Sequence, residues 1–252
     1  MPEYVAVSRE RHGQRRWRRF EDYGFARGEV AVPIVAAELP RVVLTLPIAF
    51  VRAGEDMVPA ALLGLQPGQN LYVAPDGRFL ASYVPAALRS YPFRLLAHPE
   101  PSRGFVLCVD ETSLCLTMAT ADDEPFFTSD GQPTQAIAGL LKHLEAVEAN
   151  RPVTARATAA LLEAGVLEPW PLKVGERDVQ GLQRVAEGQL ARLEPEALVR
   201  LRDTGALTLA YAQFFSMGHL PTLARLAELQ GRTRAAVQPI AEDLEFDFDN
   251  LA

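Results

Sequence analysis

Residues 42–96, VVLTLPIAFVRAGEDMVPAALLGLQPGQNLYVAPDGRFLASYVPAALRSYPFRLL, decide the fold class. Short runs rich in β-branched and aromatic residues alternate with turn sequences that contain Gly54, Gly68 and Gly77. Glycine takes the positive φ of tight turns at little steric cost, so this punctuation predicts an antiparallel meander. The predicted strands are residues 42–51, 58–65 and 71–73.

Prolines refine this pattern. Pro47 cannot donate a hydrogen bond to a neighbouring strand, so the first strand is predicted at a sheet edge or with a bulge. Pro85 suits the first position of a helix and Pro92 ends one, which predicts a single short helix between them. After Tyr83 the polar side chains expected near the end of the sheet are those of Arg89, Tyr91 and Arg94.

Upstream, residues 9–20, RERHGQRRWRRF, carry six arginines against one glutamate, with Trp17 and Phe20 among them. A basic tract with aromatic residues can grip phosphate and stack a base. The alternative is an arm whose rings pack on the sheet while the arginines stay solvated or pair with acidic residues. The net charge of −7 favours the second interpretation, because an acidic chain binds nucleic acid and anionic lipid poorly. Residues 30–35 are predicted to form a lead-in strand.

Downstream, two apolar runs at residues 105–109 and 114–118 flank a short polar loop. A symmetric hairpin closed over that loop would place Cys108 opposite Cys115. Two cysteines are too few for a disulfide framework or a four-cysteine metal site. In a reducing cytoplasm we expect two buried free thiols, and a disulfide, redox or metal role is the minority alternative.

From Thr134 the hydrophobic period changes from two to 3.6, which predicts helices. One helix is expected from Thr134, and a second at residues 153–164 after Pro152, closed by Gly165. His143 lies beside the apolar stripe of the first helix and is expected to be a surface or rim histidine, since no second ligand lies three or four residues away. The later predicted elements are a hairpin of residues 168–174 and 179–186, and helices at residues 196–204, 207–217 and 221–231.

Three aromatic side chains near the C-terminal half are candidate contact residues. Trp170, between two prolines, either plugs the junction of sheet and helices or presents a flat recognition surface. Phe246 and Phe248 alternate with carboxylates in the acidic stretch at residues 242–249, EDLEFDFD. Such tails commonly fold on a partner or on a groove of their own protein, by strand addition or aromatic anchoring.

Length and composition set further bounds. The 252 residues are 48% apolar, enough for the core of one large domain or two small ones. No apolar run approaches the roughly 20 residues that span a bilayer. The N-terminus reaches charged residues too early for a secretory signal, so a cytoplasmic location is predicted. A Gly-rich phosphate loop, a nucleophile elbow and a cluster of metal ligands are all missing from the sequence, so no cofactor or metal is expected and no catalytic residue is assigned.

Four segments in a fixed order carry a family resemblance: VPIVAAELPRVVLTLPIAFV, PAALLGLQPGQNLYV, FLASYVPAALRSYPFRLL and FFTSDGQPTQAI. In this order the chain resembles the SapC family of bacterial proteins, over roughly residues 10–230. The resemblance implies a protein of about this length, and the family name implies an association with a bacterial surface-layer locus. It brings no catalytic motif to any residue of this chain.

Strands first and helices afterwards, without βαβ alternation, predict an α+β fold. An antiparallel sheet from the N-terminal half is expected to pack against helices from the C-terminal half. The predicted organisation is a basic arm at residues 1–20, one α+β domain at 21–231 and an acidic tail at 232–252. Within the domain, residues 21–130 are predicted to be sheet-rich and residues 131–231 helix-rich.

Two main classes of function follow, with a third from the resemblance. The first is a non-enzymatic accessory or binding protein that recognises a protein or small molecule at the sheet edge and at the corner between Tyr83 and Arg94. Arg89, Tyr91 and Arg94 supply donors suited to a carboxylate there, and Trp170 an aromatic wall. The second is an enzyme with a scattered site, whose candidates are His12, His98, His219 and Cys108. The third is a surface-layer-associated protein. The oligomeric state has no signature in the sequence.

Overall fold

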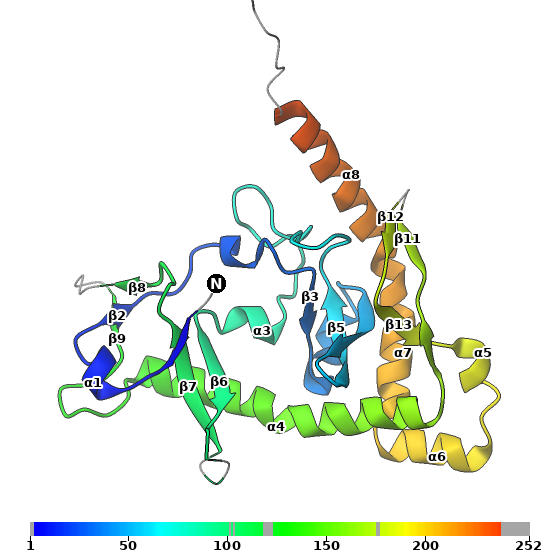
Figure 1. Ribbon diagram of the computed structural model, residues 1–252, viewed down its shortest axis with the longest axis horizontal. Coiled ribbons are helices and arrows are strands. Elements are labelled where there is room, and N and C mark those ends of the chain that lie inside the picture. The colour runs from blue at the N-terminus through cyan, green and yellow to red at the C-terminus, as the bar shows by residue number, and fades with distance from the viewer. Residues whose placement is uncertain (1–2, 101, 103, 118–122, 175–176, 238–252) are drawn as a thin grey trace, which may run out of the picture.

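The structure is a computed structural model. It describes residues 3–100, 102, 104–117, 123–174 and 177–237. Antiparallel sheets come mainly from the N-terminal half and helices dominate the C-terminal half, which confirms the predicted α+β class. Most of the strands form two β regions, a larger sheet and a group of smaller sheets. The long helix α4 (Gln135–Glu163) runs along one side of the molecule and lies next to strands of both regions (Figure 1).

The larger sheet has five strands in the order β10-β13-β4-β5-β3. Its strands are β3 (Ala31–Pro33), β4 (Ile48–Ala53), β5 (Asp56–Leu62), β10 (Leu167–Pro169) and β13 (Leu182–Val185). Strands β4 and β5 form a hairpin that turns at Gly54, with φ of 66°. The predicted lead-in strand is present in this sheet as β3. The predicted hairpin of residues 168–186 is divided: its outer residues pair as β10 and β13 in this sheet, whereas residues 172–174 and 177–179 form a separate two-stranded sheet.

Two predicted strands differ from the structure. The strand predicted at residues 42–51 begins only at Ile48, because the chain before it forms the helical turn α2 (Leu39–Val42). Pro47 therefore precedes a strand that lies in the middle of the sheet, where its missing N–H interrupts no ladder. Residues 71–73 form no strand and make only a single bridge, Val73 to Phe79.

A second β region contains two small sheets, ordered β1-β7-β6 and β8-β2-β9. The strands are β1 (Tyr4–Ala6), β2 (Arg16–Trp17), β6 (Phe93–Ala97), β7 (Phe105–Asp110), β8 (Leu116–Thr117) and β9 (Glu124–Pro125). The first two come from the basic N-terminal segment, which also contains the short helix α1 (Arg9–His12). Whether residues 1–20 act as a separate arm stays a prediction.

The predicted cysteine hairpin is wrong. Cys108 on β7 lies opposite Ala6 and Arg94, whereas Cys115 precedes β8, whose partner is β2. The carboxylate of Asp110 explains the change of direction, because it accepts hydrogen bonds from the backbone and hydroxyl of Thr112 and closes the loop locally. Both thiols are free and buried.

Helix α4 replaces the two helices predicted around Pro152. Its 29 residues continue through that proline, although a proline inside a helix removes one hydrogen bond and costs about 3 kcal/mol. Side chains next to Pro152 tie the helix to the 3-10 turn η2 (Ala36–Glu38): Thr154 Oγ1 accepts from the Ala36 amide at 2.8 Å, and Asn150 Oδ1 accepts from the Ala37 amide at 3.0 Å. Gly165 follows with φ of 66°, as predicted for the helix end.

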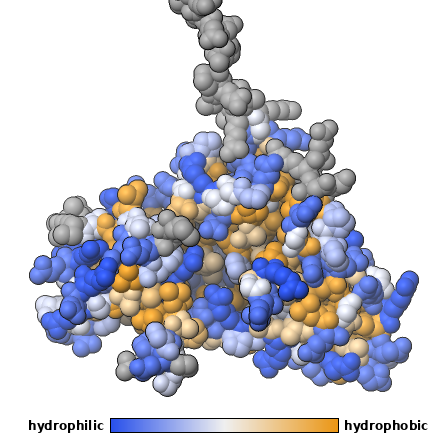
Figure 2. All heavy atoms as spheres, in the orientation of Figure 1, coloured by the Kyte–Doolittle hydropathy of each residue, from blue (hydrophilic) through white to orange (hydrophobic). Residues whose placement is uncertain are grey.

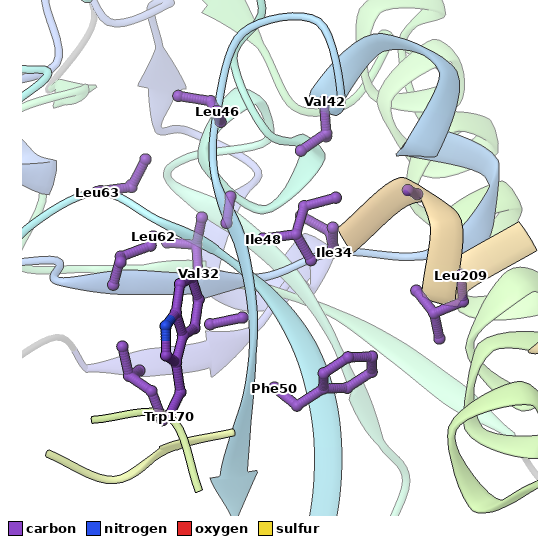
Figure 3. Packing of buried hydrophobic residues seen from close by; sticks show 14 of the residues in the cluster. Val32, Ile34, Val42, Leu46, Ile48, Phe50, Leu62, Leu63, Trp170 and Leu209 are labelled. Carbon is purple, nitrogen blue, oxygen red and sulfur yellow. The ribbon is translucent and has the colours of Figure 1, made fainter. Parts of the chain in front are cut away.

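Two hydrophobic clusters lie along α4. Ile137 and Leu144 near its start pack with the smaller cluster, which contains Trp17 and Phe93. Ala157 and Leu161 near its end pack with the larger cluster around the five-stranded sheet. Figure 3 shows part of this larger cluster, with Trp170, Phe50 and Leu209 among its side chains. Helix α4 continues because packing on each of its halves favours the helical state.

The remaining elements complete the C-terminal half. They are the hairpin β11 (Leu172–Val174) and β12 (Arg177–Val179), and the helices α5 (Glu187–Leu190), α6 (Pro195–Asp203), α7 (Ala206–Ser216) and α8 (Leu220–Val237). Helices α6 and α7 match the prediction, whereas α8 passes Gly231, its predicted end. In the face shown in Figure 2, the end around α1 and the end around α5 and α6 are mainly hydrophilic. None of the helices in the described residues has the length and apolarity needed to cross a membrane.

Candidate functional site

The structure brings together only part of the predicted contact set. Arg89 and Tyr91 line a pocket of about 790 Å³, which we call the α4 pocket. Arg94 lines a separate pocket of about 240 Å³ on another part of α4. Trp170 is 5% exposed and packs in the larger hydrophobic cluster, and it lines neither pocket. Phe246 and Phe248 lie outside the described residues.

The α4 pocket lies between the first turns of α4 and segments that precede it in the chain. Its aromatic side chains are those of Trp17, Phe20, Tyr91 and Phe93, its charged ones Arg19, Arg89 and Glu124, and its α4 residues include Ala136, Gly139 and His143. With His143 neutral, two guanidinium groups stand against one carboxylate among these residues. The pocket wall therefore carries a net positive charge that favours an anion.

Arg89 owes its position to α3 (Ala86–Arg89), the short helix predicted between Pro85 and Pro92. Its Nη2 atom donates to the hydroxyl of Tyr83 at 3.2 Å, and its guanidinium lies 5.4 Å from the centroid of that ring. Among the described residues, Tyr83 is the one acceptor of an Arg89 hydrogen bond. Since a guanidinium has five N–H donors, Arg89 retains donors for a bound group.

A buried carboxylate lies behind Tyr83. Glu38, which is 6% exposed, accepts hydrogen bonds from the Tyr83 hydroxyl at 2.8 Å and from the Ala86 amide at 2.7 Å. Its second oxygen accepts from the Val35 amide at 3.0 Å. Burial, and then the neighbouring Glu38 charge, raises the pKa of Tyr83 to about 12. Tyr83 therefore stays protonated at neutral pH, and its hydroxyl donates a hydrogen bond to Glu38.

Aromatic contacts hold the remaining walls of the pocket. Trp17 meets the edge of Phe93, with ring centroids 4.9 Å apart and planes at 83°. Tyr91 stacks on Phe25 with centroids 3.9 Å apart and planes at 7°. Phe20 contacts both Phe25 and Tyr91. These rings come from different segments and pack against one another, so the wall is formed by contacts within the protein itself.

Two polar atoms of the pocket's side chains are buried without a hydrogen-bond partner in the described part of the chain: Nε1 of Trp17 and Nε2 of His143. An unpartnered buried donor costs about 1–3 kcal/mol, so each such atom in a native protein calls for an explanation. Trp17 is 4% exposed, and its indole N–H is a donor only.

His143 is the one histidine that lines the pocket. Burial lowers its pKa, the Arg89 charge lowers the pKa further, and Glu38 opposes both effects. His143 is therefore neutral at physiological pH, with one N–H and one lone pair on its ring. It is half-buried at the pocket wall, which fits the rim position among the two predicted for it.

The histidines and the thiol proposed for a scattered enzyme site lie in separate places. His12 is fully buried, its Nδ1 accepts from the Ser8 amide, and its Nε2 lies 3.2 Å from Glu111. His219 Nε2 lies 3.0 Å from the carbonyl oxygen of Val43. His98 Nδ1 accepts from the Glu100 amide in a local turn, and Cys108 is buried in β7. The described residues contain no group of three or more histidine, cysteine or acidic side chains placed to hold a metal.

The neighbouring pocket is a weaker candidate. Arg94 lies on β6 with its guanidinium 4.7 Å from the ring centroid of Tyr4. Arg151 lines the same pocket and pairs with Glu148 at 2.7 Å. The pocket is less than a third of the volume of the α4 pocket, and none of its side chains has a buried unpartnered atom in the described part of the chain.

Comparison with known proteins yields one match. A family model described as SapC matches residues 7–223 of the chain, a range that contains every residue of the α4 pocket. The chain has no significant match among curated proteins or among solved structures.

Proposed function

Starting from the fact that this chain belongs to the SapC family, we propose that it is a non-enzymatic binding protein that takes a small organic anion into the α4 pocket. The family itself supplies no reaction. The proposal rests on the pocket, where Arg89 is fixed by Tyr83 and retains free donors. A guanidinium binds a carboxylate through two parallel charge-assisted hydrogen bonds, which are about twice as strong as neutral ones.

The chemistry of the pocket supports binding over catalysis. General acid–base catalysis needs a proton donor or acceptor oriented by a second group, and His143 has no hydrogen-bond partner for Nε2 in the described residues. The other histidines contact elements away from this pocket. Aromatic walls with a few polar groups are typical of ligand pockets.

A titration of the whole protein with small anions tests this function. We expect carboxylates to bind, and Arg89→Ala to weaken binding at least tenfold, since the loss of charge-assisted hydrogen bonds is worth about 1.5–3 kcal/mol. Arg89→Lys keeps the charge and is expected to retain part of the affinity. Isothermal titration calorimetry at fixed ionic strength provides the measurement.

Arg94→Ala is the matched control, because Arg94 lines the neighbouring pocket. It is expected to leave the affinity unchanged. Loss of binding in Arg94→Ala with full binding in Arg89→Ala would move the site to the smaller pocket. If both variants bind carboxylates with the affinity of the unmodified protein, the proposed anion site at Arg89 is refuted. A cytoplasmic location, a protein partner and a surface-layer association remain predictions alongside this proposal.

A further inference from the structure

Gly139 is an exposed glycine in the first half of a long helix. It lies inside α4, where glycine is less stable than alanine because it loses more backbone freedom. Its backbone is helical, and a Cβ atom built on it would meet nothing within 4 Å. By contrast, a Cβ on Gly64 would lie 1.8 Å from the carbonyl oxygen of Gln69. The protein's own packing thus explains Gly64 and does not explain Gly139.

The open space beside Gly139 is the α4 pocket. Residues three and four apart share a face of a helix, so Ala136, Gly139 and His143 lie along one side of α4, and all three line the pocket. Two small residues there leave the helix backbone accessible over about one turn. A glycine that no neighbour requires fits a site where a ligand approaches the backbone closely.

The other walls are suited to a flat ring. The side chains of Trp17, Phe20 and Tyr91 reach the pocket from segments outside α4, held by the ring contacts described above. Offset stacking and edge-to-face contacts between aromatic rings contribute stability beyond the burial of area. A planar ligand can contact such rings on one side and the small-residue face of α4 on the other.

We propose that the anion is an aromatic carboxylic acid, with its ring against the Gly139 face of α4 and its carboxylate at Arg89. This inference rests on the proposed binding function and adds the chemical class of the ligand. The cation at Arg89 and the small-residue face of α4 at Gly139 then select for two separate properties, charge and planarity.

Four probes separate these properties: 2-naphthoate, benzoate, cyclohexanecarboxylate and 2-naphthylmethanol. Calorimetric titration of the full chain is expected to give the order naphthoate above benzoate, with cyclohexanecarboxylate at least tenfold weaker than benzoate because it is not planar. Naphthylmethanol keeps the ring without the charge and is expected to bind at least tenfold more weakly than naphthoate.

Gly139→Leu tests the position of the ring. Leucine is a good helix former and its Cβ meets no atom, so the variant is expected to fold. The leucine side chain would fill the space beside α4 that the ring is proposed to occupy, so the affinity for 2-naphthoate is expected to fall at least tenfold. Gly139→Ala is a smaller change and is expected to lower the affinity for 2-naphthoate two- to fivefold. This variant provides the test if Gly139→Leu fails to fold. Ala155→Leu, on the exposed side of the same helix, is the control and is expected to bind normally.

The outcomes distinguish this inference from the function on which it rests. If cyclohexanecarboxylate binds as tightly as benzoate, or if both Gly139 variants bind 2-naphthoate like the unmodified protein, the aromatic ligand and its position are refuted. The anion-binding function then stands provided that Arg89→Ala still weakens the carboxylates. If no carboxylate binds at millimolar concentration, both proposals are refuted.

Discussion

Arg89 and Tyr83 contact each other in two ways: the Arg89 guanidinium lies 5.4 Å from the ring centroid of Tyr83, and Nη2 of Arg89 donates a 3.2 Å hydrogen bond to the Tyr83 hydroxyl. The Tyr83 hydroxyl in turn donates a 2.8 Å hydrogen bond to the buried carboxylate of Glu38. Tyr83 thereby links a cation on the pocket wall to a carboxylate in the interior. Networks of this kind polarise their members and fix their geometry.

Tyr83→Phe is expected to destabilise the protein by about 1.5–3 kcal/mol, because Glu38 loses a hydrogen-bond donor inside the protein. Urea denaturation at neutral pH measures the change. Tyr211→Phe is the control, since Tyr211 is 50% exposed on α7, and it is expected to change the free energy of unfolding by less than about 0.5 kcal/mol. Equal effects of the two substitutions would contradict the role given to the Glu38 hydrogen bond.

Gly139→Ala is expected to raise the free energy of unfolding by about 0.5–1 kcal/mol, since alanine favours the helix and its Cβ meets no atom. Gly165→Ala is the matched substitution at the end of α4. Gly165 has φ of 66°, and a left-handed conformation costs a residue with a Cβ roughly 1–2 kcal/mol, so this variant should be less stable. Thermal melts compare the two, and a stabilised Gly165→Ala together with a destabilised Gly139→Ala would contradict the geometry of both sites.

The two thiols are expected to be unreactive in the native protein. Burial raises the pKa of Cys108 and of Cys115, and only the thiolate is nucleophilic. A thiol reagent at pH 8 should therefore label fewer than about one tenth of the thiols in native protein over the time in which urea-unfolded protein is labelled completely. Mass spectrometry locates the labels. Rapid labelling of either cysteine in native protein would show that its strand opens or that its thiol is accessible.

Local signals in the sequence predict much of the fold. Paired prolines around Arg89 predict α3, and the glycine turn at Gly54 predicts the β4–β5 hairpin. Pro152 misleads, because a local rule ends a helix there, while the packing of α4 on two clusters and the bonds from Thr154 and Asn150 outweigh the lost hydrogen bond. The hydrogen bond lost at Pro152 can be predicted from the local sequence, whereas the tertiary contacts that compensate for it cannot.

The candidate site is less predictable for the same reason. Arg89 and Tyr91 can be selected from the sequence as polar residues at a turn. Trp17 and His143 lie far from them in sequence and reach the pocket only through the tertiary fold. At Gly139 the sequence shows only a glycine inside a predicted helix. The open space beside it can be seen only in the folded protein. For Trp170 the sequence leaves two positions open, a plug between sheet and helices or a recognition surface, and its burial in the core matches the plug.

The stability of the protein is expected to fall as the pH drops from 7 to 5, in part through His143. Burial lowers the pKa of His143 in the folded protein, so the unfolded chain binds more protons in this range. The contribution is complete above the unfolded pKa of about 6.5 and is lost as the pH falls through the lower folded value. His143→Gln cannot titrate, so its free energy of unfolding, from urea curves at pH 7, 6 and 5, should decline less steeply. Lys142→Gln, an exposed neighbour on α4, should keep the slope of the unmodified protein, and identical slopes for all three proteins would refute this contribution.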